Sequence, residues 1–587
     1  MNSTHVSAVS LTLIIYAILA VVYFGWGKAA TYLLGLGRQE NCSVTPFIWM
    51  GWAFTLLVFQ LLHFAFPLTA TVVAPVFIVG AALAIPHIVT AFRRYLEQPS
   101  MPPILLGIMP VVLAMSGWIA ARSMLPPTNY DSGLYHFNAI RWINSFPVVL
   151  GLGNLHGRLA FNQSFFTYAA ALNFYPFFRH GCSVANSFLL LFTMATLIDS
   201  LCPLLRQPSL LKAAHPFQYV SVLFVFPIAG YLVFSSNGLA SPSPDLASAL
   251  LQITMFTILC QGIGGWIRGH TNQTDRAMLL GVLAVTAVTV KLSNLAFSIV
   301  IMSFILSYAW KRDATDVTVP IIVSSVSIIL VWCLRGVALS GAPLYPSTIG
   351  YLPVDWAVPI EKVADEANWV YSWARQPGVH WSNVLGSWGW FEPWILKISK
   401  NLIGVVYPLA SSVVFCSLTA AIIYFKKGRR LQSIEWVILL PSVIGLIYWF
   451  FTAPAPRFAN ALFFLTPISV ILLFFSSIQD IVKGRVLVAI VCVVFVTGNL
   501  NVLAYATYRR WVIRAISTAG WHGVKEVPLD RRVTESGLVV YTPKTGDQCW
   551  DAPLPCTPYF NDGLRLRIPG DVASGFTVKV QDPNGNY

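Results

Sequence analysis

Charged side chains are scarce in this chain of 587 residues, of which Asp, Glu, Lys and Arg make up only 10%. Hydrophobic residues make up 56%. This composition excludes an intrinsically disordered chain and is atypical of a soluble domain. Acidic residues number 23 against 37 Lys and Arg. In a membrane protein such a basic excess first reflects Lys and Arg in cytoplasmic loops, so it does not indicate a nucleic-acid partner.

Several motifs of soluble enzymes are also lacking. The sequence contains no Walker loop, no GxGxxG after a strand, no HExxH and no GxSxG. The glycines of "GIGG" at 262–265 stand at the end of an apolar run, where packing or a turn explains them. ATP-driven chemistry within the chain, zinc-protease chemistry and serine-hydrolase chemistry are therefore disfavoured.

Long apolar runs, in contrast, recur along nearly the whole chain. Runs of 17 to 25 residues are typical of membrane-spanning helices. We expect about fourteen of these helices and hence an all-α polytopic membrane protein. The expected crossings are 9–26, 46–65, 68–92, 104–124, 182–201, 216–236, 246–266, 277–290, 294–310, 318–337, 402–424, 433–452, 458–477 and 485–506.

The loops between these runs predict an orientation. If the uncharged N-terminus lies outside, every inside loop carries at least two basic residues, as cytoplasmic loops do. The basic groups are Lys28 and Arg38, Arg93 and Arg94, Arg206 and Lys212, Arg268 and Arg276, Lys311 and Arg312, 426–430, and Lys483 and Arg485. Segments 125–181, 338–401 and the tail from about 507 then lie outside. We expect the inner membrane of a bacterium, with the active site and C-terminus on the periplasmic side.

Composition suggests three parts. Residues 1–103 hold the first transmembrane helices, which we interpret as a peripheral addition. Residues 104–506 form the main transmembrane region, with an aromatic segment at 161–178 that we expect to lie on or dip into the outer leaflet. Residues 507–587 alternate apolar and polar positions in "GLVVYTPK", "LRLRIPG" and "GFTVKVQ", which predicts a small β-rich module on the outer face.

Cysteine is infrequent, and seven of the nine residues lie in or beside apolar runs, where a lone buried Cys is usually inert. The other two, Cys549 and Cys556 in "CWDAPLPC", stand close together in the tail. In an oxidising outer compartment this spacing favours a disulfide over free thiols or a metal site.

Polar residues gather in "NYDSGLYHFNAIRWINSFPVVLGLGNLHGRLAFNQSFF", residues 129–166. Asp131 follows an apolar run directly, and a carboxylate held partly desolvated there can act as a general base. It can equally cap the short helix that the apolar stripe after it predicts. Candidate substrate-binding residues follow in the same stretch: His136, Arg141, Asn154, His156 and Arg158. A glycine-rich turn beside such donors suits a phosphate or a sugar. Side chains that are merely exposed to solvent would give the same sequence pattern.

Three further residues stand near the outer face at distant points of the chain. Asp245 is the only acid of "SPSPDLASAL" and can be a helix cap or a second catalytic carboxylate. Lys291 lies between two short apolar runs, where an ionisable residue is a functional candidate. Arg457 is the sole charge in "TAPAPRFAN", where nearby prolines position it. The loop at 340–394 adds many Trp and Tyr residues, which suit either membrane anchoring or sugar binding.

This set of features resembles the GT-C superfamily of membrane glycosyltransferases. The segments "NYDSGLYH", "GLGNLHGRLAFN", "SGAPLYPS", "VDWAVP", "TAPAPRFA" and "CWDAPLPCTP" look like signatures of a bacterial membrane-protein family in that superfamily. The resemblance implies a polyprenyl-phosphate-sugar donor, a glycan, lipid or protein acceptor, and a membrane-lipid environment without nucleic acid. Asp131 would match the catalytic acid and Asp245 a second acid. No cofactor is firmly implied, and a divalent cation, Mg²⁺ or Mn²⁺, is the alternative.

The sequence thus predicts a lipid-phosphate-dependent glycosyltransferase in which Asp131 is the general base and Arg457, Arg158 and Lys291 neutralise the leaving phosphate. Two alternatives stay open. One is a polymerase or ligase of lipid-linked glycan, and the other is a transporter or flippase. Clustering of the polar residues at one face favours an enzyme over a transporter.

Overall fold

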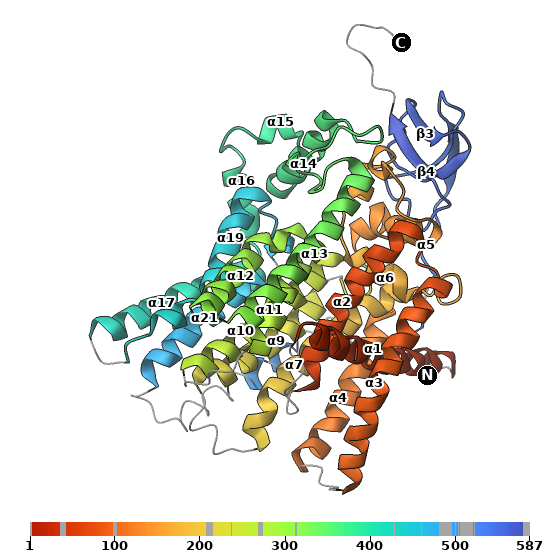
Figure 1. Cartoon of the computed structure of the whole chain (residues 1–587). Coiled ribbons are helices and arrows are strands. Elements are labelled where there is room, and N and C mark those ends of the chain that lie inside the picture. The colour runs from red at the N-terminus through yellow and green to blue at the C-terminus, as the bar shows by residue number, and fades with distance from the viewer. Residues whose placement is uncertain are drawn as a thin grey trace.

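The computed structural model of the chain describes residues 3–35, 43–97, 103–206, 215–235, 238–267, 274–311, 314–425, 429–459, 461–479 and 523–578, with 520, 521 and scattered positions between 493 and 504. Most of these residues are helical (Figure 1). The first half contains α1 Ser3–Leu33, α2 Val44–Ala65, α3 Ala70–Glu97, α4 Pro103–Ser123, η1 Ser132–His136, α5 Phe137–Ser145, η2 Leu152–Asn154, η3 Gly157–Ala160, α6 Phe165–Leu172, α7 Gly181–Arg206, α9 Pro216–Ser235, α10 Pro244–Ile267 and α11 Thr274–Val290.

The second half continues with helices and ends in strands. Its elements are η4 Leu292–Asn294, α12 Leu295–Trp310, α13 Thr315–Ser340, α14 Ile360–Arg375, α15 Trp381–Val384, α16 Phe391–Ile398, η5 Leu402–Val406, α17 Tyr407–Tyr424, α18 Ser433–Trp436, α19 Leu440–Thr452, α20 Pro456–Ala459, α21 Leu462–Ile478, β1 Leu529–Val533, β2 Val539–Pro543, β3 Leu564–Ile568 and β4 Asp571–Val578.

Among the described residues, nine helices are long and apolar enough to cross a membrane. They lie in α1, α2, α3, α7, α10, η4–α12, α13, η5–α17 and α18–α19. The expected number of fourteen is not confirmed. The expected crossings at 104–124, 216–236, 277–290 and 458–477 coincide with α4, α9, α11 and α21, which are not among the nine, and 485–506 lies almost wholly outside the described residues.

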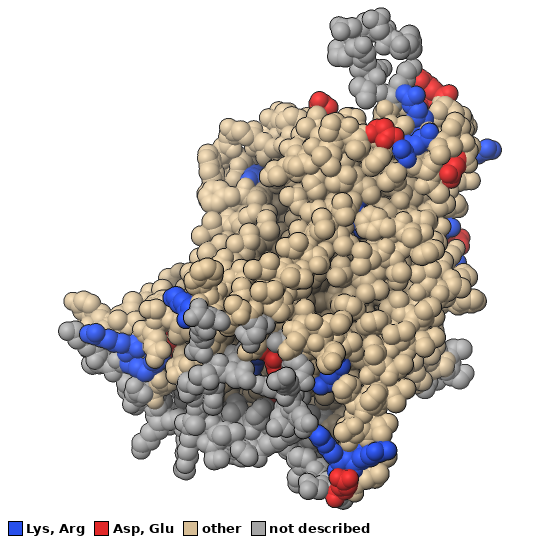
Figure 2. Space-filling model, in the orientation of Figure 1, with Lys and Arg blue, Asp and Glu red and all other residues tan. Residues whose placement is uncertain are grey.

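The outer surface is consistent with a membrane environment. Figure 2 shows few Lys, Arg, Asp or Glu side chains across the middle of one face, and these charges gather toward its two ends. Exposed side chains on α3, α13 and α17 are large and apolar, among them Ile78, Val323 and Val413. A lipid-facing surface has this distribution, because apolar side chains there need no water.

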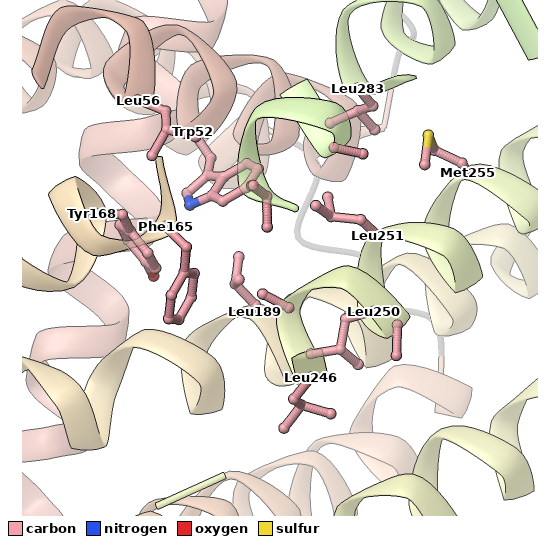
Figure 3. Packing of buried hydrophobic residues seen from close by; sticks show 14 of the residues in the cluster. Trp52, Leu56, Phe165, Tyr168, Leu189, Leu246, Leu250, Leu251, Met255 and Leu283 are labelled. Atoms are coloured by element: carbon pink, nitrogen blue, oxygen red, sulfur yellow. The ribbon is translucent and has the colours of Figure 1, made fainter. Parts of the chain in front are cut away.

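The core of the bundle forms around α10, which is buried along nearly its whole length. Leu246, Leu250 and Leu251 of α10 lie close to Leu189 of α7 and Leu283 of α11 (Figure 3). Trp52 of α2 makes an edge-on contact with Tyr168 of α6, with ring centroids 5.8 Å apart. Such tightly packed large side chains fix the relative positions of the helices that carry the polar loops.

Two expectations about the bundle need adjustment. Helix α2, which we interpreted as part of a peripheral addition, packs against α6, α7, α11 and α13 and so belongs to the core. The aromatic segment 161–178 contains α6, every residue of which is buried in protein. Its apolar character therefore reflects packing against α2, α5 and α7.

The C-terminal module consists of two antiparallel hairpins, β1–β2 and β3–β4. The β-rich prediction is thus confirmed for the described part of the tail, and β2, β3 and β4 fall in segments that alternate as strands. The sequence LDRRV of β1 was not anticipated, because three of its five residues are charged. Cys549 and Cys556 form a disulfide in the loop between the two hairpins.

Candidate active site

A large cavity lies where the C-terminal module meets the helical bundle. Its volume is about 2870 Å³. Segments far apart in the chain line it: 130–136, 153–163, 243–245, 289–295, 344–349, 358–377, 394–401, 448–458 and parts of 535–578. The polar stretch at 129–166 therefore opens onto the same space as the loops that carry Asp245, Lys291 and Arg457.

Asp131 stands at the entrance to η1, a π-helical turn that leads into α5. Its side chain makes no capping hydrogen bond to the turn, and its own backbone N–H donates to Asn129 Oδ1 at 2.9 Å. Next to it, the hydroxyl of Ser132 contacts the hydroxyl of Ser241, which ties this turn to the loop before α10. The capping interpretation of Asp131 thus has no supporting contact, and its carboxylate is directed elsewhere.

Two guanidinium groups meet the Asp131 carboxylate. Arg457 Nη1 donates to Asp131 Oδ2 at 3.0 Å, and Arg158 Nη1 lies 3.9 Å from Oδ1. Burial alone would raise the pKa of Asp131, but these cations, Arg457 foremost, hold it below its usual value. Asp131 is therefore ionised at neutral pH.

Arg457 is held by the loop around it. The indole of Trp449 donates to the carbonyl of Ala455 and that of Trp394 to the carbonyl of Pro454, both at 2.7 Å. These bonds hold the proline-rich connection between α19 and α20, so the guanidinium is presented from a restrained backbone. The Arg457 side chain is 45% exposed and lines the cavity.

A second ion pair lies beside the first. Lys291, between α11 and η4, contacts Asp245 in the first turn of α10. The Lys291 Nζ and the Arg457 Cζ lie 4.4 Å and 4.8 Å from the ring centroid of Phe458. Because one aromatic ring contacts both cations, Lys291 and Arg457 are neighbours on the cavity wall.

The two histidines line the cavity as neutral groups. Burial lowers the pKa of His136 and of His156 to about 3 in each case. His136 Nδ1 and His156 Nε2 are buried without a hydrogen-bond partner within the protein. Neutral imidazoles with an unused ring nitrogen can accept or donate a hydrogen bond to a ligand.

Arg141 and Asn154 occupy different settings. Arg141 is not among the residues that line the cavity and pairs with Asp551 of the C-terminal module at 3.3 Å. Asn154 does line it, but its Nδ2 donates to the carbonyls of Trp356 and Phe576 at 2.9 and 3.2 Å. Both side chains therefore hold the outer loops and the module together.

Sequence reasoning assigned no role in the site to Glu366 or to the C-terminal module. Glu366 of α14 lies 3.5 Å from Arg158 Nε, so Arg158 bridges two carboxylates. Burial raises the pKa of Glu366. The sequence of α14 alone does not reveal this contact, because the contact depends on the conformation of the loop at 153–163.

The module contacts the Asp131 turn directly. The backbone N–H of Trp550 donates to the carbonyl of Gly133 at 2.8 Å, and Gln548 Nε2 donates to the carbonyl of Tyr130 at 2.8 Å. A Cβ atom at Gly133 would lie only 2.5 Å from the indole of Trp550. The glycine of "YDSGLYH" therefore lets the disulfide loop pack on the turn that carries Asp131.

A divalent cation fits these residues poorly. Asp131 is already paired with Arg457, and Asp245 with Lys291, whereas Mg²⁺ and Mn²⁺ bind carboxylates that can turn toward them. Among the described residues no group of three or more His, Cys, Asp or Glu side chains is placed to hold a metal ion.

The apolar helices and the polar cavity at their end define a helical membrane protein with a candidate site for a polar ligand. A family model described as a domain of unknown function (DUF8201) matches residues 10–465, and the chain belongs to that family. Comparisons with curated proteins and with solved structures give no match. The matched range includes Asp131, Asp245, Lys291 and Arg457 and ends before the C-terminal module.

Proposed function

We propose that the protein is a membrane glycosyltransferase that moves a sugar from a polyprenyl-phosphate-linked donor to a glycan, lipid or protein acceptor. The observation that supports this most is the convergence of one ionised carboxylate, Asp131, with Arg457, Arg158 and Lys291 at a single cavity. Group transfer from a phosphate needs a base for the incoming hydroxyl and fixed cations for the leaving group. The cavity offers both.

In the proposed reaction Asp131 takes the proton from an acceptor hydroxyl. That oxygen bonds to the anomeric carbon while the bond from this carbon to the phosphate oxygen breaks, and the configuration inverts. The electron pair of the broken bond leaves with the lipid phosphate. Arg457, Arg158 and Lys291 then balance its charge, because fixed cations stabilise negative charge that develops on a leaving group.

The wall near Arg457 suits the lipid part of such a donor. Trp394, Tyr448 and Trp449 line the cavity there, next to helices whose outer faces carry exposed apolar side chains. An isoprenoid chain can reach lipid from this side while its phosphate stays beside Arg457. With the charge distribution of the loops, this arrangement suits catalysis on the periplasmic face of a bacterial inner membrane.

The size of the cavity also favours a related reaction. Sites for small molecules measure about 300 to 1,000 Å³, whereas this cavity measures about 2870 Å³. A donor that carries several sugars would fill it better than a single sugar. A lipid-linked glycan polymerase or ligase, which uses the same transfer step, is therefore the second candidate.

The test is a transfer assay on the purified full-length protein in lipid nanodiscs. Polyprenyl-phosphate sugars and polyprenyl-diphosphate glycans are offered as donors, and the products are separated by mass. We expect Asp131→Asn to lose transfer and the control Asp530→Asn, an exposed residue of β1, to retain it. Near-normal turnover by folded Asp131→Asn would reject the base assignment.

A further inference from the structure

The lining of the cavity is uneven in charge. Arg457 and Lys291, each paired with a carboxylate, lie on the wall formed by α20 and the α11–η4 junction, where the proposed donor phosphate binds. Arg158, which contacts both Asp131 and Glu366, connects this wall to a second one. Helix α14 and the C-terminal module form that second wall. They contribute six carboxylates to the lining and only two cations: Glu361, Asp365, Glu366, Glu535, Asp547 and Asp562 against Lys362 and Arg565.

Aromatic and amide groups accompany these carboxylates. Tyr559, Phe560 and Asn561 of the module line the cavity, as does Trp369 of α14. Tyr559 is 53% exposed, and its ring makes an edge-on contact with the imidazole of His156 at a centroid distance of 5.3 Å. An aromatic face beside hydrogen-bonding groups fits a sugar ring, whose C–H face is apolar and whose rim bears hydroxyls.

A buried polar atom at this wall also lacks a partner. His156 is 5% exposed, and its Nε2 has no hydrogen bond within the protein. The neighbouring Glu366 carboxylate is paired with Arg158, whose Nε lies 3.5 Å from Oε1. Buried polar groups are normally satisfied, so the unpaired nitrogen of His156 supports a hydrogen-bonding ligand beside this wall.

We propose that His156, Glu366, Tyr559 and the adjoining edge of the module form the acceptor subsite, and that it binds an uncharged carbohydrate. This inference rests on the proposed function and specifies its second substrate. The wall carries an excess of negative charge, which would repel uronic acids, sialic acids and phosphorylated glycans. A neutral glycan meets no such penalty and can use the aromatic face and the carboxylates as hydrogen-bond acceptors.

Binding of soluble oligosaccharides to the full-length protein in nanodiscs tests the subsite apart from catalysis. The probes are gluco-oligosaccharides, N-acetylated chito-oligosaccharides and oligogalacturonides of equal length, measured by calorimetry at low salt. We expect at least one neutral series to bind about tenfold more tightly than the galacturonides. Equal or tighter binding of the galacturonides, or binding of none of the three series, would overturn the inference.

Variants locate the binding on the module. We expect Tyr559→Ala to weaken binding of the neutral series by about five- to tenfold, because a stacked sugar loses its aromatic face. Tyr559→Phe keeps the ring, and Lys544→Ala changes an exposed residue of the module outside the cavity lining. Lys544→Ala should bind as the unchanged protein does, and Tyr559→Phe should bind more tightly than Tyr559→Ala. Unchanged binding by Tyr559→Ala would contradict the subsite.

The two proposals fail in different ways. If the unchanged protein transfers no sugar from any of the donors but the Tyr559 series behaves as expected, the glycosyltransferase assignment fails and a carbohydrate site remains. If Asp131→Asn abolishes transfer while Tyr559→Ala leaves the half-saturating acceptor concentration unchanged, the assignment stands and the acceptor subsite is wrong.

Discussion

Two clusters of charge lie beyond opposite ends of α19, one before Leu440 and one after Thr452, and they differ in what surrounds them. At one end Glu435 is fully buried, and each of its oxygens has a protein partner. Arg429 Nη2 donates to Oε1 at 2.5 Å, Ser476 contacts the same oxygen, and the backbone N–H of Gln432 donates to Oε2 at 2.7 Å. His215 lies 3.5 Å away.

At the other end the charges face open space. The side chains of Arg457 and Arg158 are 45% and 30% exposed, and both line the cavity together with Asp131. We infer that a buried ion pair in a membrane protein need not mark a reaction site. The cluster around Glu435 closes a helix terminus, whereas the one around Asp131 leaves cationic surface available to a ligand.

The largest expected effect is the difference in transfer activity between variants of Asp131 and of Glu435. We expect Asp131→Asn to reduce transfer by about 10²- to 10⁴-fold, because a general base contributes that much. Glu435→Gln should leave the turnover of the folded fraction close to normal. Steady-state assays normalised to folded protein measure both. An equal loss of turnover in the two variants would remove the distinction between the clusters.

We expect the two variants to differ in stability in the opposite sense, with Glu435→Gln the less stable protein. Glu435→Gln leaves Arg429, whose side chain is 18% exposed, without its counter-charge, and breaking such a pair costs up to about 3 kcal/mol. Asp131→Asn sits beside partly exposed cations and should change stability far less. Denaturation in detergent, followed by intrinsic fluorescence, compares the two variants. The comparison breaks down if Asp131→Asn is the less stable protein.

Arg457 provides a finer test of the open cluster. We expect Arg457→Gln to weaken binding of a polyprenyl-phosphate analogue about tenfold, since one charge-assisted contact to the phosphate is lost. Arg457→Lys should recover part of the affinity, because it restores the charge without the planar guanidinium. Surface plasmon resonance on nanodiscs measures the series. Identical affinity in all three proteins would exclude Arg457 from the phosphate site.

The smallest expected effect is a dependence on pH. Burial and the nearby Arg457 lower the pKa of Lys291 to about 7, although Asp131 and the contact with Asp245 favour the charged form. The amine is therefore charged below this pKa and loses its charge as the pH rises through it. Affinity for inorganic diphosphate should fall severalfold between about pH 6 and about pH 9.

The variant Lys291→Arg is the control for this dependence, because a guanidinium stays charged over the whole range. Calorimetric titrations should show no such fall in affinity for this variant. A fall of equal size in both proteins would assign the titration to another group. His136 and His156 do not titrate in this pH range, because burial lowers their pKa values to about 3.

Much of the candidate site could be predicted from local sequence. Asp131, Asp245, Lys291 and Arg457 each stand out as rare charges beside an apolar run, and the structure brings all four to one cavity. The roles of Glu366 and Tyr559 could not be predicted in this way. Glu366 is one of several acids on a solvent-facing helix, and only its contact with Arg158 distinguishes it.

Tertiary packing also limits what the sequence predicts about the fold. Apolar runs identify helices well, yet the number of crossings depends on lengths that tertiary packing decides, as α11 and α21 show. Arg141 illustrates the limit for single residues. Its charge and its place beside Asp131 in the chain favoured a ligand contact, but the short α5 directs it to Asp551.

The close approach of Gly133 and Trp550 has a consequence for protein engineering. Any side chain larger than the hydrogen atom of Gly133 would collide with the indole ring of Trp550. The C-terminal module and the turn that carries Asp131 should therefore be exchanged together. A chimaera that grafts a foreign tail onto this bundle should retain the tryptophan, and one that grafts this tail elsewhere should bring the glycine with it.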